Sequence, residues 1–189
     1  MIGTASGEDA PISEKEIAKQ REVLRLSHKN LDGLLRMCRA ATKVEVFEGL
    51  PHPYWEHDML MQEQKRPDVF QNHGFGFYTP ALKLAETDYK LLFPKVTLAN
   101  SYHEWWGPKA CGGFHPDLLV RFHGDKGVVD VHLCFGCGEA DFHGPKTKAH
   151  VDMQDEAHDA WQGIPVRNQI KRPHKKRLQQ DEEIPGIPK

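Results

Sequence analysis

The feature that most constrains the fold of this chain is a predicted β-hairpin. Two apolar runs at 118–122 and 128–135 flank a turn-rich segment at 123–127, as expected for two strands joined by a short loop. Each run alternates, so that apolar residues share one face and more polar residues share the other. In the simplest register Arg121 lies opposite Asp130, which is a favourable cross-strand pair. The sequence therefore predicts a hairpin with one apolar face.

A cysteine-rich motif stands at the open end of this hairpin. The second strand leads into Cys134-Phe-Gly-Cys137-Gly, in which the glycines permit a tight turn and both sulfurs can point at one ion, as in a zinc knuckle. Cys111 and His115 precede the first strand, which begins beside the end of the second strand in an antiparallel hairpin. The sequence therefore predicts a structural Cys3His zinc site formed by these four residues, with His132 as the reserve ligand.

Other interpretations of the cysteines compete with zinc binding. A structural disulfide is the first alternative, with Cys38 or Cys111 pairing into the group. A redox-active Cys-x-x-Cys normally opens a helix after a strand, but the residues after Cys137 are too short and broken for such a helix. The remaining alternative is four ordinary buried thiols. Metal binding is the interpretation that the spacing favours.

The motifs also carry a resemblance to a known group of proteins. The pattern K-x-C-G-G-F-H-P-D…C-F-G-C-G-E, with V-E-V-F-E-G-L-P-H upstream, resembles a family of uncharacterised bacterial proteins of planctomycete-type genomes. The similarity covers residues 44–139. It implies that the cysteine and histidine cluster is a feature of the family, and it implies no activity.

Composition limits the size and setting of the protein. A chain of 189 residues suits one domain with a real core, and an apolar fraction of 39% is low enough to predict that part of the length is tail. Four cysteines are too few for a disulfide-dense scaffold. No apolar run is long enough to span a membrane, and the first residues do not resemble a signal peptide. We therefore expect a cytoplasmic protein; an exported domain whose signal peptide is absent from the sequence is the alternative.

The order of elements predicts an α+β fold. We expect a small antiparallel sheet, with its central hairpin at about 118–135, packed against N-terminal and C-terminal helices. Ser13 and Glu16 match a capping box at the start of the first helix. The predicted divisions are a disordered N-terminus at 1–12, a single domain at 13–162 and a basic, proline-containing flexible tail at 163–189.

The finer prediction within the domain is as follows. The first helical segment carries a break near 30–33. The helix predicted at 86–93 is expected to end at Pro94. Strands are predicted at 44–48, 73–78 and 140–143, extended structure at 96–102, and helices at 53–65, 86–93 and 149–161.

An aromatic and charged stretch directly precedes the cysteines. Two adjacent tryptophans cannot both face one core, so one of them is expected at the surface or over a pocket. A hydrophobic lid over the metal loop is the simpler interpretation, and a pocket with acid–base groups is the alternative. The residues of this candidate pocket are His103, Glu104, Trp105, Trp106 and Glu139.

The whole chain has a formal net charge of −2. A basic run in the tail contrasts with an acidic remainder. The run contains no aromatic residues for stacking on bases, so a solvated tail is the favoured interpretation. Binding of nucleic acid or an acidic partner is the alternative. The candidate polyanion-binding residues are Lys171, Arg172, Lys175, Lys176 and Arg177.

Three functions remain in competition. The favoured one is a binding or scaffold module, with an unknown protein partner, whose zinc site is closed by four protein ligands. The second is a metal-dependent enzyme, or a protein that handles copper or zinc, with an open three-cysteine site. The third is a nucleic-acid-associated protein that binds through its tail. The number of protein ligands around the ion separates the first two.

Overall fold

The computed structural model describes residues 13–168 and 171–173. The predicted disorder at 1–12 and most of the predicted tail lie outside these residues. The elements are α1 (Glu14–His28), α2 (Leu31–Arg39), β1 (Lys43–Glu48), α3 (His57–Glu63), β2 (Val69–Asn72), β3 (Phe75–Tyr78), α4 (Glu86–Val96), a 3-10 turn (Ala99–Ser101), β4 (Tyr102–Glu104), β5 (Leu118–Gly124), β6 (Gly127–Cys134), β7 (Glu139–His143), β8 (Lys148–Met153), α5 (Asp155–Trp161) and α6 (Gly163–Asn168).

A six-stranded antiparallel sheet organises the molecule, in the order β1-β5-β6-β7-β8-β4. The predicted hairpin is its centre: β5 pairs with β6, and Arg121 lies opposite Asp130 with a 2.7 Å ion pair. The α+β class is confirmed. The capping box is present as well, since Ser13 and Glu16 bond reciprocally at the start of α1.

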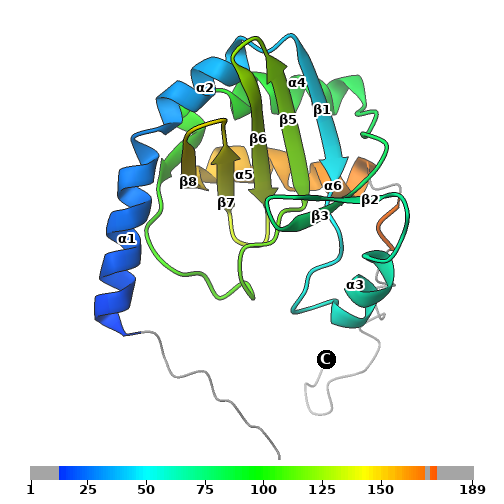
Figure 1. Cartoon of the computed structure of the whole chain (residues 1–189), viewed down its shortest axis with the longest axis horizontal. Helices are drawn as coiled ribbons and strands as arrows, with labels where there is room; N and C mark the ends of the chain where they lie inside the picture. The colour runs from blue at the N-terminus through cyan, green and yellow to red at the C-terminus, as the bar shows by residue number, and fades with distance from the viewer. Residues whose placement is uncertain (1–12, 169–170, 174–189) are drawn as a thin grey trace, which may run out of the picture.

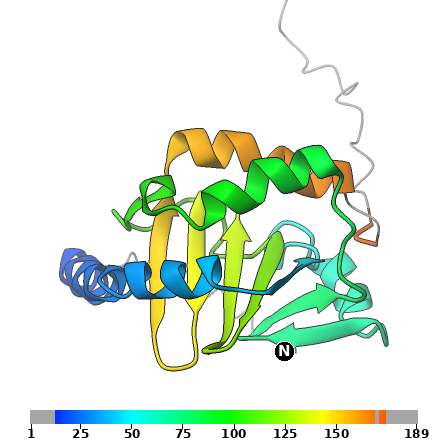
Figure 2. The ribbon, with the colours of Figure 1, turned by 90° about the horizontal axis from the view of Figure 1, so that it is seen from above.

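One face of the sheet packs against helices. Figure 2 shows α4, α5 and α6 above the strands, while α2 crosses their near side. Alternate side chains of β5 to β8 point into this layer and meet apolar side chains of the helices. The largest fully buried side chain is that of Trp161, which α5 inserts into the core. The main core therefore lies between the sheet and its helices.

The opposite face is divided into two parts. The β2–β3 hairpin covers its β1 and β5 side, where Phe47, Phe77 and Leu119 form a second, smaller apolar cluster (Figure 1). The side formed by β6, β7 and β8 instead carries polar residues at every second position. We call this side the polar face; its residues are Asp130, His132, Cys134, Glu139, Asp141, His143, His150 and Asp152.

The largest error of the sequence-based prediction concerns residues 149–161. This segment was predicted as one helix, but it contains β8 followed by α5. Ala149, Val151 and Met153 alternate into the core, whereas Ala157 and Trp161 face it from the helix. The alternation of the strand is followed directly by the helical spacing of α5, with no turn signal between them. The large residues of the whole segment therefore fit a helical spacing, and the strand was missed.

Three other boundaries need correction. Helix α4 continues through Pro94 to Val96 and a 3-10 turn follows at Ala99–Ser101, so the extended structure predicted at 96–102 is wrong except at Tyr102, where β4 begins. Strand β2 was not predicted, although it pairs with β3. Helix α6 lies in the segment predicted to be a flexible tail, and its Ile164 is fully buried in the main core. The packed part of the chain therefore extends beyond residue 162.

Candidate functional site

The register of the sheet arranges the polar face in rows that run across the strands. In the central row His132 of β6 is paired with Asp141 of β7, which is paired with His150 of β8. In one flanking row Asp130 lies opposite His143. Because side chains at alternate positions of a strand point to the same side, these groups all project from one surface. Histidines and carboxylates are thereby brought together from three strands.

Two histidines and one carboxylate of this face form a compact group. Nitrogen atoms of His132 and His143 and a carboxylate oxygen of Asp141 lie within 4.8 Å of one another. His143 Nε2 is 2.8 Å from Asp141 Oδ2. His132 is completely buried, and His143 and Asp141 keep 17% and 19% of their side-chain surface exposed. Solvent therefore reaches the group at His143 and Asp141 and not at His132.

A chain of hydrogen bonds fixes which nitrogen of His132 carries its proton. Arg121 holds the Asp130 carboxylate, and this carboxylate accepts a 2.8 Å hydrogen bond from Asn72 Nδ2. The amide of Asn72 is thereby oriented with Oδ1 towards His132 Nε2, at 2.6 Å, so Nε2 is the donor. His132 Nδ1 then holds a free lone pair. Within the described residues it is the one buried side-chain nitrogen or oxygen without a hydrogen-bond partner.

The charges around the group favour a neutral His132. Burial and the neighbouring His143 lower the pKa of His132 to about 3. Asp141 is partly buried, which opposes ionisation, but its hydrogen bond with His143 and its ion pair with His150 hold its pKa well below the usual range. The site therefore combines an ionised carboxylate with an imidazole whose nitrogen is free to accept.

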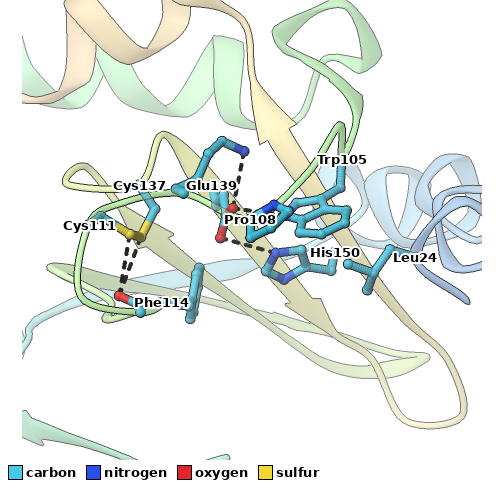
Figure 3. A pocket seen from close by; sticks show the side chains of 10 residues that line it. Leu24, Trp105, Pro108, Cys111, Phe114, Cys137, Glu139 and His150 are labelled. Atoms are coloured by element: carbon cyan, nitrogen blue, oxygen red, sulfur yellow. Dashed lines mark hydrogen bonds and ion pairs between the residues drawn. A yellow bond between two sulfur atoms is a disulfide. The ribbon is translucent and has the colours of Figure 1, made fainter. Parts of the chain in front are cut away.

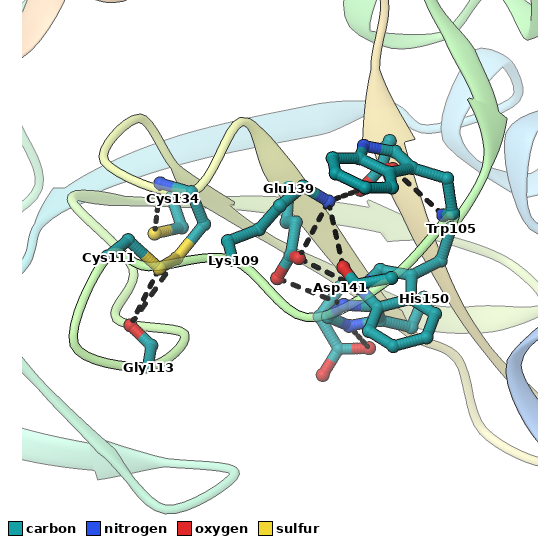
Figure 4. A network of polar contacts seen from close by, with 12 residues as sticks. Trp105, Lys109, Cys111, Gly113, Cys134, Glu139, Asp141 and His150 are labelled. Carbon is teal, nitrogen blue, oxygen red and sulfur yellow. Dashed lines mark hydrogen bonds and ion pairs between the residues drawn. A yellow bond between two sulfur atoms is a disulfide. The ribbon is translucent and has the colours of Figure 1, made fainter. Parts of the chain in front are cut away.

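His150 is the cation of the polar face. Its Nε2 is 3.2 Å from Glu139 Oε2, and its Nδ1 is 3.7 Å from Asp141 Oδ1. Burial disfavours the charged ring, yet the bonds to these two carboxylates raise the pKa of His150 to about 9. Figure 4 shows this ring between the two acids. His150 is therefore an imidazolium at neutral pH and helps to hold Asp141 in place.

We expect the stabilising effect of His150 to depend on pH. Its folded pKa is higher than the unfolded value of about 6.5, so its contribution is complete below pH 6.5 and is lost as the pH rises through about 9. Urea unfolding of metal-free wild type and His150→Gln should differ by about 2–3 kcal/mol at pH 6 and by much less at pH 10. A difference that does not change between these pH values would contradict this assignment.

The cysteines lie next to this region, at the end of β6. Cys111 and Cys137 form a disulfide, whereas Cys134 and Cys38 are free and buried. The disulfide joins Cys111 to the Cys-x-x-Cys group, which is one of the pairings considered from the sequence. Zinc binding by Cys111, His115, Cys134 and Cys137 requires the reduced form, and for that form it stays a prediction.

Two histidines accompany the cysteines. His115 is buried, and burial lowers its pKa to about 4. The ring of His52 lies beside that of His115, with centroids 4.9 Å apart. His132, the predicted reserve ligand, instead belongs to the His/Asp group.

The predicted aromatic pocket is split between two hollows. Trp105 and Glu139 line a cavity of about 330 Å³ together with His150 and the disulfide (Figure 3). His103 and Trp106 line a separate hollow of about 260 Å³. Trp105 is buried and donates a 2.9 Å hydrogen bond to Glu139, whereas Trp106 is exposed, as expected for one of two adjacent tryptophans. Glu104 is exposed at the surface.

Two of the predicted polyanion-binding residues are engaged within the molecule. Lys171 pairs with Asp68 at 2.6 Å, and Arg172 pairs with Glu56 at 2.6 Å and with Asp117 at 3.1 Å. Acidic groups of the body thus neutralise both cations. The other three predicted residues, at 175–177, lie outside the described part of the chain.

The sequence contained a signal for the His/Asp group that the prediction did not use. Asp130, His132 and Cys134 alternate along one strand, and Glu139, Asp141 and His143 alternate along the next. Polar residues at alternate positions of two neighbouring strands share a face when the strands pair. This pattern indicates a polar cluster, although the partner of each residue depends on the register.

Comparison with protein-family models, with curated proteins and with solved structures finds no match for this chain. Among residues 13–168 and 171–173, no helix combines the length and the apolar character needed to cross a membrane. The case for a function therefore rests on the geometry of the polar face and of the cysteine group.

Proposed function

We propose that this protein binds one divalent first-row transition-metal ion through His132, Asp141 and His143. Two observations carry the proposal together: His132 belongs to a group of metal-ligating side chains, and its buried Nδ1 has no hydrogen-bond partner. A buried polar atom without a hydrogen bond is costly, and coordination of an ion would satisfy it. The proposed site thus belongs to the open, three-ligand class rather than to the closed Cys3His class.

The contact between His143 and Asp141 has a length that suits a common ion. Two ligand atoms bound at 2.0–2.2 Å lie about 3 Å apart when they are neighbours in the coordination sphere, and His143 Nε2 and Asp141 Oδ2 are 2.8 Å apart. In the absence of metal that contact is a hydrogen bond; coordination would displace the shared proton. Two imidazoles and one carboxylate are a donor set typical of zinc and of iron(II).

The surroundings have the features of an outer coordination shell. Asn72 accepts from the non-ligating nitrogen of His132, and His150 lies beside the second oxygen of Asp141. The ring of His73 stacks on that of His143, with centroids 3.9 Å apart. An ion with three protein ligands keeps positions for water or a small ligand, so bound metal would supply Lewis-acid activation of that molecule. The protein's own groups would orient the ligands.

A titration of the oxidised protein with Zn²⁺ tests the proposal. We expect one equivalent to bind, with the imidazole nitrogen resonances of His132 and His143 shifting on binding. Those of His123, which pairs with Glu45 elsewhere on the sheet, should not move. Absence of stoichiometric binding, or shifts confined to other histidines, would refute the proposed site.

The orientation of His132 gives a more specific prediction. Asn72→Ala removes the acceptor of the Nε2 proton without touching a ligand, so the ring loses its fixed tautomer and orientation. We expect the Kd for Zn²⁺, measured by chelator competition, to rise about 10- to 100-fold. Gln71→Ala, at an exposed neighbouring position of β2, is the matched control and should bind as the wild type does. Equal affinities of the two variants would show that Asn72 has no such role.

A further inference from the structure

We infer that the three cysteines at the end of β6 form a second, redox-controlled metal site. In the oxidised form Cys111 and Cys137 are joined by the disulfide and no zinc binds there. Reduction frees both sulfurs, which together with Cys134 form a three-thiolate site that binds zinc. The fourth ligand comes from the neighbouring His52–His115 pair. The inference is independent of the function proposed for the His/Asp group.

One backbone group donates to the sulfur of Cys134. Its Sγ accepts a hydrogen bond from the N–H of Cys137, at 3.3 Å. Burial raises the pKa of the Cys134 thiol to about 12, and this hydrogen bond offsets the effect only in part. A bound metal ion would supply the charge that stabilises a buried thiolate, because cysteine binds a metal in its deprotonated form. The hydrogen bond also links Cys134 to Cys137, a second member of the group.

The loop that carries Cys111 brings the other sulfurs to the same point. The carbonyl oxygen of Gly113 lies 3.6 Å from Cys111 Sγ and 3.4 Å from Cys137 Sγ. Figure 4 shows the three sulfurs gathered around the end of the hairpin, with this carbonyl beside them. Gly112 and Gly113 adopt φ values of 82° and 96°, a region that favours glycine and that lets the loop fold back on the hairpin.

Two histidines lie beside the cysteine loop. The rings of His52 and His115 are neighbours, with centroids 4.9 Å apart, and His115 follows Cys111 by four residues. Trp55 Nε1 bonds to the carbonyl of Cys111 at 3.1 Å and anchors the segment that presents His52. Three sulfurs with one imidazole complete a four-coordinate structural zinc site.

The redox step balances with a dithiol reductant. The two thiols of the reductant give up two electrons and two protons and become a disulfide, while the Cys111–Cys137 bond breaks and both sulfurs become thiols. Zinc then binds the three sulfurs as thiolates, and the thiol protons pass to solvent. Cys111 is partly exposed, so the reductant has a sulfur to attack.

Cobalt binding to the full chain tests this inference, because cobalt bound to thiolates absorbs through sulfur-to-metal charge transfer and cobalt bound to the His/Asp group does not. We expect one equivalent without charge-transfer bands in the oxidised protein, and two equivalents with these bands after reduction. In a His143→Gln background the reduced protein should still bind one equivalent with the bands. Thus either site can fail without the other.

Variants locate the site. Cys134→Ser and Cys111→Ser should each lose the charge-transfer bands, while Cys38→Ser, which changes a buried free thiol of α2, should retain them. Circular dichroism identifies any variant that fails to fold, and the partly exposed Cys111 is the safer of the two positions. Unchanged bands in the folded Cys134→Ser protein, no bands in the reduced wild type, or four free thiols in the air-oxidised protein would overturn the inference.

Discussion

We expect that replacing His143 by glutamine will abolish stoichiometric zinc binding by the oxidised protein, whereas replacing His123 by glutamine will leave it unchanged. Both histidines lie on the same sheet, and each places Nε2 next to a carboxylate, at 2.8 Å from Asp141 and 2.7 Å from Glu45. They differ in their neighbours, because only His143 shares its carboxylate with a buried imidazole that has a free nitrogen. An ordinary histidine–carboxylate pair is therefore the control for the proposed ligand.

The expected size of this effect follows from the number of ligands. Loss of a group outside the coordination sphere weakens metal binding about 10- to 100-fold, so loss of one of three protein ligands should raise the Kd by more than about 100-fold. Chelator competition gives the two affinities, and thermal unfolding shows that both variants are folded. Comparable affinities for His143→Gln and wild type would remove His143 from the site.

The hairpin could be predicted because its signals are local. Alternation within two neighbouring runs and turn residues between them define both strands, and the pair of Arg121 with Asp130 follows from the length of the turn. The Cys134–Cys137 knuckle could be predicted for the same reason, because its two cysteines are close together in the sequence. The arrangement of Cys134 with Cys137 is therefore visible in the sequence, whereas the oxidation state of Cys137 depends on Cys111, which approaches through a separate loop.

The His/Asp group could not be predicted in full because its members meet through non-local pairing. His132 was visible as a polar residue beside the cysteines, but its partners come from β7 and from β2. Strand β2 is a short run without clear alternation, so Asn72 gave no sign of its role. In β8 the spacing of His150, Met153 and Trp161 fits a helix, and the strand that places His150 beside Asp141 was missed.

Replacing Phe142 by alanine should destabilise the protein more than any surface change on the sheet. Phe142 lies on β7 between Asp141 and His143, but its side chain points to the other face of the sheet. There it is fully buried and packs edge-on against Tyr102, with ring centroids 5.2 Å apart. Loss of a buried phenylalanine costs about 3–5 kcal/mol in free energy of unfolding. Val128→Ala, at a 38% exposed position of β6, should change it by less than about 0.5 kcal/mol.

The same variant tests whether the two faces of β7 act separately. Because the side chain of Phe142 points to the opposite face from the proposed ligands, the folded Phe142→Ala protein should still bind one zinc ion. Zinc at 100 times its Kd should then add about 2.7 kcal/mol to the free energy of unfolding. Urea unfolding with and without zinc, at a temperature where the variant is folded, measures both quantities. A small loss of stability would contradict the packing of β7 against the helices. A large loss without rescue by zinc would instead indicate that the metal site depends on the core beneath it.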